Sequence, residues 1–170
     1  MQPKAFFFIF LPDLICNFAS VGKVMRELVE KALAEVLFQN EYVKIGINSE
    51  LSLVTVKWRR QIFLEERKAG YHTVFEFVKK QAAQNLLVDN SNLFLFSIDE
   101  KRWVAETFNA WVNQTSIRKF ALVTSDEYRN LLDLSEYINT AKQHYQFLNK
   151  VSHEFFTDYE TAVFWITDQF

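Results

Sequence analysis

The feature that most constrains the fold is a set of apolar segments followed by residues that start helices. Three pairs fit the capping box, namely Ser97 with Glu100, Thr124 with Glu127, and Thr157 with Glu160. In that motif the hydroxyl accepts a hydrogen bond from an unpaired backbone N–H, and the acid reaches back to another. Two of the pairs directly follow apolar segments, and the third comes one loop after such a segment. The pattern predicts alternating strands and helices in an α/β domain.

Residues 42–58 alternate with a period of two, unlike the helical spacing around them. We expect a strand over 42–47, a turn at Asn48-Ser49-Glu50 and a second strand over 51–58, which together form a hairpin. A long helix is predicted over about 63–84, with an apolar stripe. The stripe consists of Tyr71, Val74, Phe75, Val78 and Ala82. The charges of residues 65–68 and of Lys79-Lys80 are interpreted as solvated helix faces.

Further short apolar strands are expected at 86–88, 120–123 and 151–156. Strands separated by helices must cross over, so most of the sheet should be parallel or mixed. The prediction is therefore a mostly parallel mixed sheet of about five strands, opened by the hairpin and covered by four to five helices. No linker or repeat interrupts the chain after residue 40.

Composition and motif content argue against several functional classes. The chain has 170 residues with 19 Lys and Arg against 21 Asp and Glu, which gives no basic footprint for nucleic acid. A single Cys excludes a disulfide framework, and three isolated Gly cannot build a phosphate-binding loop. None of the three His has a second ligand at metal spacing. We therefore expect no cofactor, no metal and no catalytic motif. An enzyme whose catalytic residues are scattered along the sequence is the remaining alternative.

The first 24 residues are interpreted as an apolar extension to a single domain over 25–170. The apolar run at 5–15 is interrupted by Pro12 and Asp13, so it is too short to span a membrane. One alternative is a start at Met25, from which a helix follows with Val36 on its stripe. Others are a signal peptide within residues 1–20, which would mean export, and a segment that docks on the domain or on a membrane. A cytoplasmic location is the main expectation.

Several segments resemble the STAS (sulfate transporter and anti-sigma factor antagonist) fold, over about residues 40–167. The segments that carry the resemblance are 54–58, 86–92, Trp103, 120–123 and 155–166. Among proteins of that fold, the chain more closely resembles the small stand-alone STAS-like proteins of bacteria. The resemblance implies a protein-interaction or regulatory module. STAS antagonists are switched by phosphorylation in an Asp-Ser-Ser-Gly-like stretch, which Phe96-Ser97-Ile98-Asp99 does not match, so Ser97 is interpreted as a helix cap.

Two polar clusters follow the strands at 86–88 and 120–123. They are Asp89, Asn90, Ser91 and Asn92 after the first strand, and Thr124, Ser125 and Asp126 after the second. If these strands are neighbours, the clusters form one rim where a polar ligand or a partner could bind. The alternative is that these residues serve turns and helix caps.

Phe94-Leu95-Phe96 lies in the loop between the first polar cluster and Ser97. Apolar side chains in a loop are typical of a partner surface, a lid or an apolar pocket, or of a loop that shields the sheet. The leading hypothesis is a non-enzymatic STAS-like module that contacts a protein partner through this loop and the rim, including Phe94, Phe96 and Ser97. The alternative is a carrier or sensor of a small apolar ligand held beneath the loop.

Overall fold

The computed structural model describes residues 35–125 and 151–167. In this part of the chain six strands form one mixed sheet in the order β1-β2-β3-β4-β5-β6. The strands are β1 (Glu35–Gln39), β2 (Val43–Asn48), β3 (Leu53–Trp58), β4 (Asn85–Asp89), β5 (Lys119–Val123) and β6 (Ser152–Phe156). The helices are α2 (Leu64–Gln81), α3 (Ile98–Trp103), the π-helical turn η1 (Val104–Phe108), α4 (Asn109–Asn113) and α7 (Tyr159–Ile166).

The hairpin predicted from the alternating pattern is confirmed as β2 and β3. The two strands pair antiparallel, with Val43 opposite Trp58 and Asn48 opposite Leu53. The Asn48 side chain accepts a hydrogen bond from the backbone N–H of Leu51, which shapes the turn. From β3 onward each strand pairs parallel with the next, so the α/β class and the mixed sheet are confirmed.

One strand and one cap differ from the prediction. Residues 35–39 form a sixth strand, and Val36, predicted on a helical stripe, lies opposite Gly46. The helix predicted from residue spacing therefore extended too far along the sequence. The residues at 36–38 include β-branched and aromatic side chains, which also suit an edge strand. At the last helix the N-cap is Asp158, whose carboxylate accepts a hydrogen bond from Thr161 N at 2.7 Å, rather than Thr157.

Several predictions concern residues outside the described ranges. These are the extension over 1–24, the helix expected from Met25, the helix expected after Thr124 with Glu127 in its cap, and Asp126.

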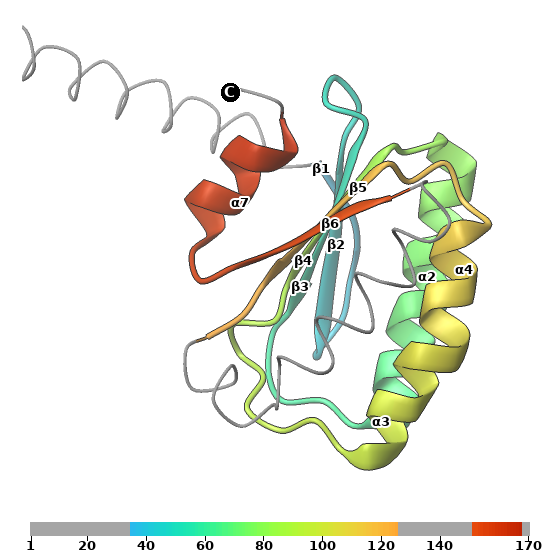
Figure 1. Ribbon diagram of the computed structural model, residues 1–170, viewed down its shortest axis with the longest axis vertical. Coiled ribbons are helices and arrows are strands. Elements are labelled where there is room, and N and C mark those ends of the chain that lie inside the picture. Colours follow the sequence, from blue (N-terminus) through green and yellow to red (C-terminus); the bar gives the residue numbers. More distant parts are fainter. Residues whose placement is uncertain (1–34, 126–150, 168–170) are drawn as a thin grey trace, which may run out of the picture.

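The sheet separates two helical layers. Helices α2, α3 and α4 cover one face, and α7 lies against the other, over β4, β5 and β6 (Figure 1). The larger core lies under α2 and α4, and the smaller one joins Leu53, Leu87 and Ala121 to α7. The two described connections between parallel strands, from β3 to β4 and from β4 to β5, therefore pack on one face. This is expected when parallel strands follow in order with right-handed connections.

Helix α2 confirms the long predicted helix and lies very close to the sheet. Tyr71, Val74, Phe75 and Val78 are buried on its stripe, but Ala82 is an exposed left-handed cap. A Cβ atom added at Gly70 would lie 2.5 Å from Cη2 of Trp58, a side chain with no exposure.

Residues 98–113 form a single helical run that contains a π turn. Four of its five buried positions recur every four residues, at Glu100, Val104, Phe108 and Val112, and the fifth is Asn109. An α-helix turns about 100° per residue, so such a repeat drifts about 40° at each step. The wider turn at Val104–Phe108, in which Asn109 N donates to the carbonyl of Val104, offsets this drift and keeps all four positions on the buried side of the run.

No helix in the described part of the chain is long and apolar enough to cross a membrane.

Candidate functional site

The two polar clusters meet at one edge of the sheet, namely the edge formed by the carboxyl ends of the parallel strands, as the sequence suggested. Strands β4 and β5 are parallel neighbours with Asp89 opposite Val123. Asn90 N donates to the carbonyl of Val123 at 2.8 Å, and Thr124 N donates to that of Phe156 at 2.9 Å. Residues after β4 and β5 therefore lie side by side. The order of the six described strands never reverses, however, so this edge lacks the switch point at which ligand crevices form.

Most polar groups of this edge are engaged in local structure. The Asp89 carboxylate pairs with Lys57 Nζ at 2.8 Å and accepts a hydrogen bond from Ser91 N at 2.9 Å. Asn92 Nδ2 donates to the carbonyl of Trp58 at 2.9 Å. Asp89, Asn90 and Thr124 are buried. The edge thus offers less polar surface to a ligand than the sequence suggested, because the Asp89 and Asn92 side chains bind other parts of the chain and Asn90 and Thr124 are buried.

Tyr159, the first residue of α7, lies near the Asp89 carboxylate. Burial, and secondarily the Asp89 charge, raise the pKa of Tyr159 to about 12 from its usual value of 10.0. A group whose folded pKa is raised stabilises the fold below its unfolded pKa, and this contribution is lost as pH rises through the folded value. The stability contributed by Tyr159 should therefore fall between about pH 10 and 12.

A titration of phenolate absorbance with unfolding curves at each pH tests this expectation. Tyr159→Phe should remove a phenol that ionises near pH 12 and should flatten the alkaline loss of stability. Burial also raises the pKa of Tyr71, so some alkaline loss should remain in the variant. An unchanged titration curve in Tyr159→Phe would contradict the assignment.

The Phe94-Leu95-Phe96 loop is held in an ordered conformation by Gln61. The Gln61 Oε1 atom accepts hydrogen bonds from Phe94 N at 2.9 Å and Leu95 N at 3.1 Å, and its Nε2 donates to the carbonyl of Leu95. Phe94 is 52% exposed and Leu95 55% exposed. Their exposure therefore belongs to a hydrogen-bonded loop, and the expectation of a shielding loop does not hold for these two side chains.

Other large apolar side chains are exposed beside this loop. Phe63 is 69% exposed just before α2, and Ile98 is 75% exposed at the start of α3. Phe63 and Leu95 both line a shallow depression of about 220 Å³ that Leu64 and Phe96 also border. We call Phe63, Phe94, Leu95 and Ile98 the apolar patch. The sequence pointed to Phe94 but not to Phe63 or Ile98, which lay next to predicted helix starts.

A buried ion pair lies behind the patch. Arg67 Nε contacts Glu100 Oε1 at 2.9 Å, and both side chains are nearly inaccessible. The other Glu100 oxygen accepts a hydrogen bond from Ser97 N, while Ser97 Oγ accepts one from Glu100 N. The Ser97 capping box is thus confirmed, and its acid also joins α3 to α2. The interpretation of residues 65–68 as wholly solvated is wrong at Arg67.

Phe96 packs over this pair. The Arg67 guanidinium lies 4.8 Å from the centre of the Phe96 ring. Phe96 is half-buried, in contrast to its two neighbours in the loop. It therefore belongs to the packing of the ion pair rather than to the exposed surface.

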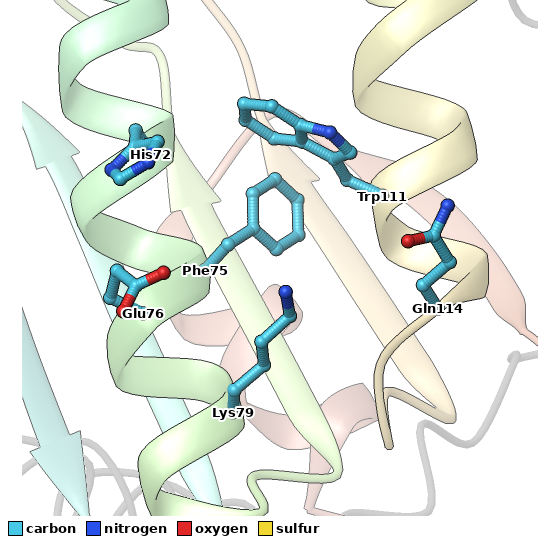
Figure 2. A pocket seen from close by; sticks show the side chains of 6 residues that line it. All are labelled: His72, Phe75, Glu76, Lys79, Trp111 and Gln114. Atoms are coloured by element: carbon cyan, nitrogen blue, oxygen red, sulfur yellow. The ribbon is translucent and has the colours of Figure 1, made fainter.

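A second depression lies between α2 and α4. Figure 2 shows that its floor is aromatic and its rim polar. Its volume is about 170 Å³, and the lining residues are His72, Phe75, Glu76, Lys79, Trp111 and Gln114. Among residues 35–125 and 151–167 no three His, Cys, Asp or Glu side chains are grouped to hold a metal ion.

Comparison of the chain with protein-family models, curated proteins and solved structures finds no match.

Proposed function

We propose that this chain is a non-enzymatic STAS-like module that binds a partner protein through the apolar patch. The observation that carries the proposal is the exposure of Phe94 and Leu95 in a loop that Gln61 holds by three hydrogen bonds. Exposed apolar side chains grouped around a depression are typical of protein contacts. A loop that is already ordered loses little conformational freedom when a partner binds.

The STAS-like assignment rests on the sequence resemblance and is supported by the order of the elements. A hairpin leads into α2, then into β4, the helix that bears Trp103, β5 and finally β6 with α7. The resemblance covered the same segments in the same order. A regulatory role in the cytoplasm, the location expected from the sequence, goes with this assignment.

Charges around the patch indicate what kind of partner would fit. Arg60 pairs with Glu66 at 2.7 Å, a contact that lowers the pKa of Glu66, and Arg102 lies 3.5 Å from Asp99. The ionic groups beside the patch are therefore largely balanced within the chain. A partner with one or two apolar side chains for the depression, and without a strong charge of its own, matches this surface.

The patch can be tested by comparing the proteins captured by matched variants. Phe63→Ser with Leu95→Ser removes apolar area at the depression and leaves the Arg67–Glu100 pair in place. Val36→Ser changes an apolar side chain that is 47% exposed on β1. In quantitative pull-downs from native lysate, the patch variant should lose at least about 90% of a specific partner, because losing two anchors costs more than 1.4 kcal/mol. The Val36 variant should retain it. Equal capture by both variants would contradict the proposal.

The carrier alternative predicts a ligand retained beneath the loop. In the described part of the chain the space beside Phe96 is about 220 Å³, below the range usual for drug-sized ligands. Most aromatic side chains there pack on one another, as Tyr71 does on Trp103 and Phe108. Native mass spectrometry of gently purified protein distinguishes the two functions, since a carrier should show a bound apolar molecule.

A further inference from the structure

The depression between α2 and α4 combines an aromatic floor with polar side chains at its rim. Phe75 and Trp111 meet edge to face, with ring centres 5.1 Å apart, and His72 lies 6.2 Å from Trp111. Lys79 and Gln114 stand at the rim, one on each side. Polar groups that converge on an apolar floor are the usual composition of a small-molecule site.

In the described part of the chain, the Lys79 ammonium on one side of this depression has no partner. The structure gives no hydrogen bond or ion pair to the side chains of Lys79 or Gln114 in the described residues. Figure 2 shows the Lys79 ammonium extending from α2 toward the Phe75 ring, and the Gln114 amide extending into the same space from the end of the other helix. An ammonium and an amide can together hold a carboxylate.

The π turn sets the direction of the helix residues that line one side of the depression. It contains one residue more than an α-helical turn, so the residues after it are rotated by about 100° relative to an uninterrupted helix. Trp111 lies after that turn and reaches Phe75 and His72 of α2 because of it. Turns of this kind occur frequently at functional sites.

We propose that this depression binds a small aromatic monocarboxylate. The ring would lie against Phe75 and Trp111, and the carboxylate between Lys79 and Gln114. A volume of about 170 Å³ suits a single ring. Glu76 borders the same space, so a second negative charge on the ligand would meet a carboxylate. The site is separate from the apolar patch and does not depend on the proposed partner.

Benzoate titrated into the full-length protein and followed by amide and indole NMR shifts tests the site. We expect shifts at Trp111 and near Lys79, with affinity in the millimolar range. Lys79→Ala should weaken binding about three- to fivefold, because it removes one exposed charge partner. Lys80→Ala, an equal charge change at the next position, which is also exposed, should leave the affinity unchanged.

Two further ligands define the specificity. Methyl benzoate lacks the charge and should bind more weakly than benzoate, and phthalate should be rejected because of Glu76. Equal binding of benzoate to the Lys79 and Lys80 variants, equal affinity for methyl benzoate, or no shift at Trp111 would each overturn the proposal.

Discussion

Glu100→Ala is expected to lower the free energy of unfolding by about 3–5 kcal/mol, the largest effect of any substitution considered for this chain. Glu100 is the ion-pair partner of Arg67, whose side chain is 2% exposed. Among the described residues Arg67 Nη2 has no hydrogen-bond partner, so loss of the carboxylate would leave a buried cation with little compensation. The same substitution removes the acceptor for Ser97 N and weakens the start of α3.

Urea unfolding of a small set of variants measures this effect. Asp99→Ala, the neighbouring exposed acid, should change stability by no more than about 0.5 kcal/mol. Adding Arg67→Met to Glu100→Ala should recover part of the loss, because no charge then remains buried. If Glu100→Ala costs no more than Asp99→Ala, the pair does not hold α3 against α2.

Gly70→Ala should also destabilise the protein, by about 1–3 kcal/mol. Helix propensity alone predicts the opposite sign, since Ala is better than Gly inside a helix by about 1 kcal/mol. The new Cβ would lie 2.5 Å from Trp58 Cη2. Trp58 is fully buried, with Tyr71 edge-on at 5.3 Å and the Arg67 guanidinium 6.0 Å from its ring centre, so its ring cannot move aside cheaply.

A second background isolates the contact between Gly70 and Trp58. Phe at position 58 lacks the atoms that a Cβ at position 70 would meet, so Gly70→Ala should cost less in Trp58→Phe than in the native protein. Both differences in the free energy of unfolding are measured by chemical denaturation, with one m value shared by all variants. A stabilising Gly70→Ala in the native background would show that α2 does not depend on this close approach.

Sequence periodicity predicted the secondary structure correctly where burial of one face dominates. Alternation placed β2 and β3 because one face of that hairpin is buried against α2. The stripe at 71–78 placed α2 for the same reason. Spacing gave a wrong prediction at Val36, because the three or four residues there fit a helix and an edge strand equally well. Pairing with β2 decides between the two structures.

The candidate site was predicted in part. Adjacent parallel strands brought Asp89 and Thr124 to one edge, but the Asp89 carboxylate pairs with Lys57 and the Thr124 side chain is buried. The exposure of Phe94 could be predicted from its position in a loop. Arg67 could not be recognised as buried, because its partner Glu100 lies 33 residues away and sequence shows only a charged helix face.

The interaction proposal is tested most directly by photo-crosslinking from single positions of the full-length protein. A photoreactive residue in place of Leu95, which is 55% exposed at the depression, should crosslink in native lysate to the protein that the Phe63/Leu95 variant fails to capture. The same residue in place of Val36, 47% exposed on β1, should not. Crosslinks to that protein of equal yield from both positions, or from position 36 alone, would contradict a partner surface at the apolar patch.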